Sequence, residues 1–536
     1  MELSPKVHTL IKEYQLWEKE KMHERDEGNA ISVDEVAATV ASFYEKIRGI
    51  VDWREEHLLR KTAIERILKR RIITNKRSEE FAEGFLQELV RGGHFPNNSL
   101  PLKKIDEIQR IVEKYVFISE HGRSTQSVSL GKIEDWLWSI ATCEIEEALS
   151  LPRREKALIE FMYEELQTRI QIEDKKGPRG VPISNDERSL QVYIAVQRTL
   201  FKLDSATITY HIIEKFYADW SNPSQETLLN VSQDLARLYE KIRYALSHPY
   251  AEKFYQVAEK YDTPYLILGD IIAENPETFL QLTDNFSEFE ETIKSIYEQR
   301  LLRLKGRIRR AAFYSTLSVF LTKILLALSI EIPVDQYLAH GLNYTALGTS
   351  VAIPPLLMLF LVISVQTSSQ QNVNRVVTEV IRLTFLTQEQ KEPYKIRALG
   401  KPRSSSVMAI VYGMYFSSFL LTFGGIAFIL YSLEFSTLSI LILVTFLSLV
   451  SFAGTRIRKR ARELMMEVEK EGLFFGIFDF FALPMIQFGK WLSNQLVRYN
   501  LIVLLLNFLI EIPLQVFVEF LEQWRMFLKE KKEEIH

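Results

Sequence analysis

Hydrophobic residues are distributed very unevenly along this 536-residue chain. The segments 407–432 and 436–454 are strongly apolar and contain no charged residue. A helix needs about 20 apolar residues to cross the ~30 Å hydrocarbon core of a bilayer. Within lipid, only helices and closed barrels satisfy their own backbone hydrogen bonds, and an apolar run without alternation favours a helix. This pattern predicts two membrane-spanning helices.

Two further spans are predicted upstream. The segment 311–330 is apolar apart from Lys323, and we expect its helix to end at Glu-Ile-Pro, residues 331–333. The segment 346–365 forms the next span, in which the proline pair 354–355 predicts a kink or a late helix start. With four spans, the chain crosses the membrane and returns twice, so that both ends of the four-span region lie on the same side.

Clusters of Lys and Arg flank the predicted spans, and such clusters mark the cytoplasmic side of a membrane. The loop 334–344 has no Lys or Arg, so it should face outward. We therefore expect an integral membrane protein with both termini in the cytoplasm. The basic clusters are also candidate contacts for anionic lipids: Arg303, Lys305, Arg307, Arg309, Arg310, Arg456, Arg458, Lys459, Arg460 and Arg462.

The basic connection between the second and third spans predicts an amphipathic helix. Its apolar residues recur on one helical face, as in a helix that lies in the membrane interface. This face consists of Val373, Val376, Val377, Val380, Ile381 and Thr384.

The C-terminal segments 473–492 and 501–521 allow two interpretations. Both are apolar and could cross as a hairpin, which would leave Lys490 and Arg498 outside. Positive charges outside disfavour crossing, and the many aromatic residues suit a pair that lies in the cytoplasmic interface. Both interpretations stay open.

Apolar positions in the first 300 residues follow helical spacing, and strand signals are nearly absent. We expect helices over 32–50, capped by Ser32, and over 54–72, 78–90 and 102–118. The Gly/Pro-rich stretch 173–189 predicts an internal boundary. Asn222-Pro223 and Asn275-Pro276 predict two helix starts. The region after residue 190 is rich in aromatic residues, which form either a helical core or a groove for a partner.

The basic run 54–71 has three interpretations: a solvated helix face, a contact with lipid headgroups, or a nucleic-acid contact. Glu55, Glu56 and Glu65 are interleaved with the cations, and such helical pairs favour the solvated face. We expect no nucleic-acid partner.

Signatures of catalysis are missing from the sequence. Cys143, the single cysteine, lies among apolar residues and is expected to be buried. The nine histidines do not show metal-ligand spacing, and no phosphate-binding loop, zinc-protease or nucleophile-elbow motif occurs. We predict that the protein is not an enzyme and has no cofactor and no metal site.

Charged residues inside apolar segments are costly and point to function. The candidate polar site in the membrane consists of Lys323, Glu331, Asp479 and Glu511. Glu331 and Glu511 each precede Ile-Pro in similar Leu/Ile-rich segments, and inverted repeats of this kind occur in transporters. Chance similarity between two Leu/Ile-rich helices is the simpler explanation of this match.

The sequence predicts an all-α, multi-pass membrane protein. We expect helical cytoplasmic subdomains at 1–175 and 185–300, a four-span membrane domain at 301–472 and a hydrophobic C-terminal pair with a charged tail at 473–536. The favoured hypothesis is a non-enzymatic, membrane-anchored scaffold that docks a cytoplasmic partner and contacts anionic lipid. A secondary transporter or channel that uses the candidate polar site is the alternative, and homo-oligomers are compatible with either.

Overall fold

The fold is described from a computed structural model. The described residues are 2–26, 30–33, 56–74, 81–122, 129–150, 152–173, 183–338, 343–363, 370–386, 393–397, 405–466 and 473–499, with 520, 524 and 527. These parts are almost entirely helical, which confirms the all-α prediction. The predicted helix at 32–50 lies mostly outside the described residues, as does the segment 501–519.

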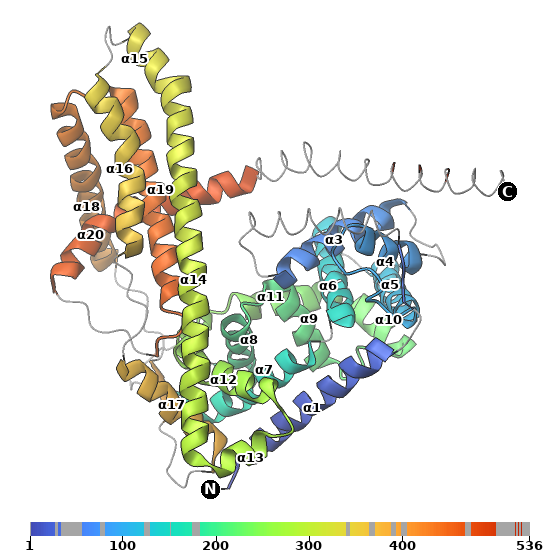
Figure 1. Ribbon diagram of the computed structural model, residues 1–536. Coiled ribbons are helices and arrows are strands. Elements are labelled where there is room, and N and C mark those ends of the chain that lie inside the picture. The colour runs from blue at the N-terminus through green and yellow to red at the C-terminus, as the bar shows by residue number, and fades with distance from the viewer. Residues whose placement is uncertain are drawn as a thin grey trace.

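The N-terminal half is a lobe of helices that lies beside one very long helix (Figure 1). Three of its predicted helices are confirmed with small shifts of their ends. Its helices are α1 (Pro5–Asp26), α3 (Glu56–Thr74), α4 (Phe81–Arg91), α5 (Lys103–His121), α6 (Leu130–Ser150), α7 (Arg153–Arg169), α8 (Asn185–Leu200), α9 (Ser205–Phe216), α10 (Gln225–Gln233), α11 (Leu235–Leu246), α12 (Ala251–Glu274) and α13 (Phe279–Asp284).

Two hydrophobic cores hold this half together. The first joins α1, α7, α8 and α12 to the long helix, and the second joins α3–α6 to α9–α11. Both cores contain residues from before and after the stretch 173–189, so this stretch is not a boundary between the two cores. Trp220, Tyr250 and Phe254 are buried, which confirms the core interpretation for these aromatic residues, and Cys143 is buried as predicted.

Two local predictions in this half are wrong. Ser224, not Asn222, caps α10, because its hydroxyl accepts a hydrogen bond from the Thr227 amide at 3.1 Å. Asn275 ends α12 instead of starting a helix. Two short strands, β1 (Ile170–Glu173) and β2 (Tyr394–Arg397), pair in parallel and connect this half to the segment after α17.

The long helix α14 (Phe286–Leu326) leads from the first core into a helical bundle (Figure 1). It continues through a π-helical turn, η1 (Ala327–Glu331), into α15 (Ile332–Leu338). The bundle also contains α16 (Tyr344–Ile363), α18 (Ser405–Ser432) and α19 (Thr437–Ala461). Among the described helices, four are long and apolar enough to cross a membrane: the continuous helix Phe286–Tyr337, α16, α18 and α19. We call them the candidate spans.

The sequence predicted that the first span ends at residues 331–333, but its helix continues past these residues into α15. The Ile332 amide donates to the Ala327 carbonyl, five residues back, in the wider hydrogen-bond pattern of a π turn. Pro333 follows directly after the π turn, at the second position of α15 within the continuous helix. In α16, Pro354 and Pro355 lie inside a helix that already starts at Tyr344, so the predicted late start is wrong.

The amphipathic helix α17 (Gln370–Thr384) exists, but its apolar face does not meet lipid. Val376, Val380 and Leu383 are buried in the first core, against α12 and α14. The interfacial interpretation of this face is therefore wrong, because the protein itself covers it.

Asn372 of α17 connects the two halves of the molecule. Its amide nitrogen donates to the Tyr297 hydroxyl at 2.8 Å and to the Leu464 carbonyl at 2.7 Å, and its amide oxygen accepts from the Met466 amide at 2.8 Å. The Lys202–Glu463 ion pair joins the same two halves. The end of the fourth candidate span is thus fixed to the N-terminal half.

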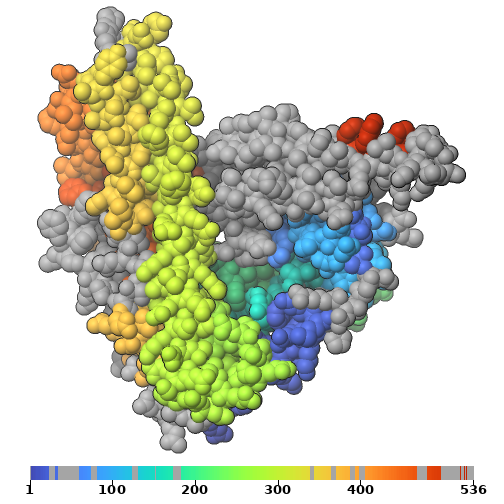
Figure 2. Space-filling view, viewed as in Figure 1, coloured from blue at the N-terminus to red at the C-terminus, as the bar shows by residue number. Residues whose placement is uncertain are grey.

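Helix α20 (Leu473–Tyr499) differs from the candidate spans in direction. It crosses the bundle obliquely behind α16 and α19, where the candidate spans run side by side (Figure 1). Ser418 and Thr422 of α18 donate hydrogen bonds to carbonyls of α20. Figure 2 shows that α14 is uncovered along its length on the opposite face of the bundle.

Candidate functional sites

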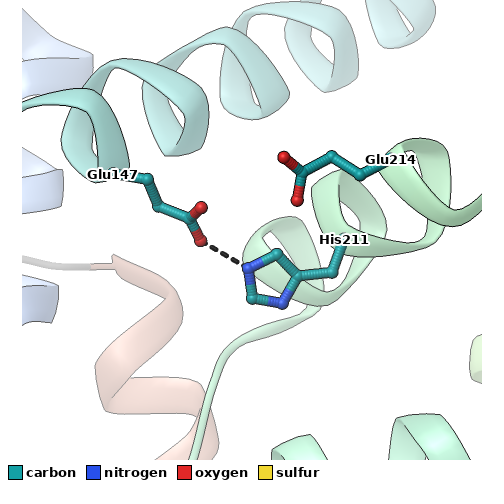
Figure 3. Close-up of side chains that lie close together, drawn as sticks. All are labelled: Glu147, His211 and Glu214. Carbon is teal, nitrogen blue, oxygen red and sulfur yellow. Dashed lines mark hydrogen bonds and ion pairs between the residues drawn. The ribbon is translucent and has the colours of Figure 1, made fainter. Parts of the chain in front are cut away.

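A group of four ionisable side chains lies in the N-terminal half, of which Glu147 and His211 are buried and Lys156 and Glu214 are half-buried. Glu147 comes from the end of α6, Lys156 from the first turn of α7, and His211 and Glu214 from one face of α9. Figure 3 shows Glu147 and His211 pointing toward each other, with Glu214 alongside. We call these four residues the charged quartet. The three packed helices bring together residues that are far apart in the sequence.

The charged quartet is closely connected. The Lys156 ammonium lies 2.6 Å from Glu147 Oε2 and 2.8 Å from Glu214 Oε2. His211 Nε2 hydrogen-bonds to the Glu147 carboxylate, and Nδ1 lies 2.5 Å from Gln197 Oε1. Both ring nitrogens of His211 therefore lie against side-chain oxygens, and Lys156 lies between the two carboxylates.

The local charges decide how Glu147 and Lys156 titrate. Burial by itself raises the pKa of Glu147, but His211 and Lys156 outweigh it and lower that pKa. Burial likewise lowers the pKa of Lys156, and here Glu147 and Glu214 outweigh it and raise the pKa. Both residues are therefore held in their charged forms at neutral pH.

The charged quartet has the ligand types of a metal site. One ligand atom each from Glu147, His211 and Glu214 lie within 4.8 Å of one another. However, Lys156 already binds both carboxylates, and a metal ligand would need a deprotonated imidazole nitrogen in place of the hydrogen bond to Glu147. A cation would have to displace Lys156, so the geometry fits an internal ion-pair network better than a metal centre.

The charged quartet was not predicted from the sequence, because Glu147 is 64 residues from His211. One local signal was present. His211 and Glu214 are three residues apart, the spacing that places two side chains on one helical face. A search for His–His spacing alone could not find it.

Two clefts adjoin the charged quartet, and Glu147 and Lys156 line both. The lateral cleft, about 1020 Å³, lies among α1, α5, α6 and α7. The junction cleft, about 560 Å³, lies between the N-terminal half, α14 and the turn after α19. Both volumes are of the size that small-molecule sites have, about 300–1,000 Å³.

In the bundle, the structure brings Lys323 and Glu331 of the candidate polar site together. Both side chains are completely buried, and the Lys323 ammonium hydrogen-bonds to the Glu331 carboxylate. Ser350 of α16 lies 3.4 Å from Glu331 Oε2, and the Lys323 ammonium lies 5.6 Å from the centre of the Phe446 ring. We call Lys323 and Glu331 the membrane pair.

The π turn explains how residues eight positions apart can meet. In a regular α-helix, about 100° per residue would leave them roughly 80° apart around the axis. The π turn accommodates one extra residue, so Glu331 takes about the position of a seventh residue, which faces Lys323. The sequence suggested Asp479 and Glu511 as partners of Lys323, but the partner is Glu331 on the same helix. The Asp479 side chain and Glu511 lie outside the described parts of the chain.

Three of the basic residues predicted to contact lipid are exposed but also adjoin other parts of the protein. Lys459 pairs with Glu259 at 3.3 Å, and Arg303 and Arg307 line the junction cleft. Lys305, Arg309, Arg310, Arg456 and Arg460 are exposed, and Arg458 and Arg462 are half-buried. Lipid contact by these residues stays a prediction.

Cations of the basic run 54–71 form ion pairs with acidic residues of the N-terminal half. Lys61 is buried and lies 2.5 Å from Asp204, Lys69 pairs with Glu65, and Arg71 pairs with Glu88. The solvated-face interpretation is therefore wrong for Lys61.

Comparisons with known proteins give no family for the chain. No protein-family model matches it, and neither a curated protein nor a solved structure resembles it significantly. Functional argument therefore rests on its own residues.

Proposed function

We propose that this chain is a non-enzymatic, membrane-anchored scaffold whose N-terminal half docks a cytoplasmic partner. The observation that carries the proposal is the continuous helix from the first core into the bundle. Asn372 and the Lys202–Glu463 pair fix a second connection between the halves. Because the N-terminal half is joined to the bundle at two points, a partner bound to this half is held at a fixed position relative to the membrane.

The surface of the bundle supports membrane anchoring. Large apolar side chains cover its outside, among them Phe360, Phe416 and Phe428, which are 63–72% exposed. Monomeric soluble proteins rarely expose apolar patches beyond a few hundred Å². Lipid would cover this surface without cost.

The lateral cleft is the docking surface in this proposal. Seven glutamates and four cations line it, and Glu20, Glu160 and Glu164 are exposed. An acidic surface attracts a positively charged partner and rejects an acidic one. We therefore expect a partner with a basic segment. Glu147 and Lys156, which line the cleft, pair with each other, and this supports a binding role over catalysis.

Photo-crosslinking in native membranes tests the proposal. A photoreactive amino acid replaces Thr9, which is exposed and lines the lateral cleft. We expect one discrete adduct, and the double charge reversal Glu160→Lys/Glu164→Lys should abolish it.

The matched control reverses two exposed glutamates away from this cleft, Glu291→Lys/Glu298→Lys. It should leave the adduct unchanged. Equal loss in both double variants, or no adduct above background in the parent, would refute docking at the lateral cleft.

The transporter alternative is favoured by one observation, the buried membrane pair at a π turn, since π turns are frequent at functional sites. Proteoliposomes loaded with a pH- or sodium-sensitive dye test it. In the alternative, the parent protein conducts and the double variant Lys323→Leu/Glu331→Leu does not. In the scaffold proposal, neither protein conducts above empty liposomes.

A further inference from the structure

The junction cleft lies where the N-terminal half meets the base of the first candidate span. Its walls come from α6 and α7, from the turn between α8 and α9, from α14 and from the turn after α19. Leu304 and Ile308 anchor α14 in the first core and leave Arg303 and Arg307, one turn apart, on the cleft side. The cleft is thus built by the packing of both halves.

The cations of the cleft outnumber the carboxylates that can neutralise them. Asp270 pairs with Arg300, Glu463 with Lys202, and Glu147 with Lys156. Burial raises the pKa of Asp262 well above its usual range, so this acid is neutral at pH 7. Glu146 lies 3.5 Å from Arg60. Of the lining acids, Glu155 and the neutral Asp262 have no ion pair within the described chain.

Three guanidinium groups remain available in the cleft. Among the described residues, Arg154, Arg303 and Arg307 have no carboxylate within the 4.0 Å of an ion pair. Arg154 lies 4.0 Å above the Trp17 ring, which holds its planar group in place. Guanidinium groups present paired N–H donors that match the oxygens of a phosphate.

We propose that the junction cleft binds a phosphate group through Arg154, Arg303 and Arg307. The group belongs to a lipid headgroup or to a soluble phosphate compound. The inference deepens the scaffold proposal, and the lipid source rests on its membrane placement.

The distance to the membrane restricts the lipid source. Arg307 precedes the apolar run at Ala311 by four residues, or ~6 Å, and Arg303 by eight, or ~12 Å. The headgroup layer of one leaflet is only about 5–7 Å thick. Arg307 reaches the level of an ordinary phosphodiester, and Arg303 needs a phosphate that projects farther. A phosphorylated inositol headgroup meets this condition, and an ordinary diacyl phosphodiester does not.

The test uses the full chain in nanodiscs. Nanodiscs of phosphatidylcholine, with or without 5 mol% phosphatidylinositol 4-phosphate, and inorganic pyrophosphate are the probes, and the thermal midpoint is the readout. We expect one probe to raise the midpoint by about 2 °C or more at saturation. A rise only with the lipid identifies the headgroup source, and a rise with pyrophosphate in plain phosphatidylcholine identifies a soluble source.

Two double variants make the test specific. Arg303→Gln/Arg307→Gln should weaken binding at least about tenfold, since each residue removes a charge-assisted contact. Arg237→Gln/Arg243→Gln makes the same charge change on the exposed face of α11 outside the cleft, and should retain binding within about twofold. No response to either probe, or equal loss in both variants, overturns the proposal. The Thr9 adduct, repeated in the Arg303/Arg307 variant, separates this failure from failure of partner docking.

Discussion

The charged quartet and the membrane pair both contain ion pairs, but they are assembled in opposite ways. The charged quartet gathers Glu147, Lys156, His211 and Glu214 from three helices and adds hydrogen bonds to Gln197 and Tyr210. The membrane pair lies on one continuous helix, and its members are eight residues apart. One is a network, and the other is an isolated pair.

This difference predicts how the stability of each site responds to the loss of one of its residues. A network has several partners per charge, so the loss of one member leaves the others partly satisfied. In the described part of the bundle, Lys323 has Glu331 as its ion-pair partner, and the only further polar contact of the pair is Ser350 at 3.4 Å. Removing one member therefore leaves an unpaired charge in an apolar environment.

The largest effect is expected from Lys323→Leu. It leaves Glu331 buried without its cation, and breaking a buried ion pair in this way costs about 3–5 kcal/mol. Unfolding in mixed detergent–SDS micelles measures the loss. The double variant Lys323→Leu/Glu331→Leu should recover to within about 1 kcal/mol of the parent, because no charge remains to be desolvated. A double variant as unstable as the single one would show that the pair is not isolated.

Glu147→Gln should cost less, about 2 kcal/mol at pH 7, because Lys156 keeps Glu214 and His211 keeps Gln197. The folded-state pKa of Glu147 lies below the ordinary 4.5, so its carboxylate stabilises the fold above that pH. This contribution is lost as the pH falls through the folded-state pKa. Chemical denaturation should therefore show the difference between variant and parent shrinking below pH 4.5, and a constant difference would contradict the assignment.

The neighbouring Glu146→Gln is a control with the opposite sign. Burial raises the pKa of Glu146 to about 7, so its ionised form is disfavoured in the folded state. The protonated carboxyl is tolerated below the ordinary pKa of 4.5, and the stability associated with it is lost as the pH rises through 7. Denaturation should find the variant equal to the parent near pH 4.5 and about 1 kcal/mol more stable at pH 8. A destabilised variant at pH 8 would show that the Arg60 contact dominates.

The sequence predicted what depends on local patterning. Apolar runs located the four candidate spans, and helical spacing located α3, α4 and α5. The chain turns at Glu434 between the last two candidate spans, where Glu434 has φ 61°. Such features are decided within about 20 neighbouring residues, which a single sequence displays.

Long-range and irregular features could not be read in the same way. The strands β1 and β2 are four residues each and pair across a large sequence separation. The apolar face of α17 was predicted to lie in the membrane interface, because the sequence does not show that α12 and α14 cover this face. The membrane pair was missed because regular helix geometry puts Lys323 and Glu331 on different faces, and only the π turn aligns them.

The smallest effects compare one hydroxyl at each site. Ser350→Ala removes a long contact to Glu331 and should cost about 0.6 kcal/mol, the average for such bonds between membrane helices. Tyr210→Phe removes a 2.8 Å hydrogen bond to Glu214 in the charged quartet and should cost about 1.5 kcal/mol, since its acceptor is charged. Unfolding of both variants under identical micelle conditions gives the order. If Ser350→Ala were the more costly change, the hydroxyl would be an essential partner of Glu331, and the membrane pair would have to be treated as a network.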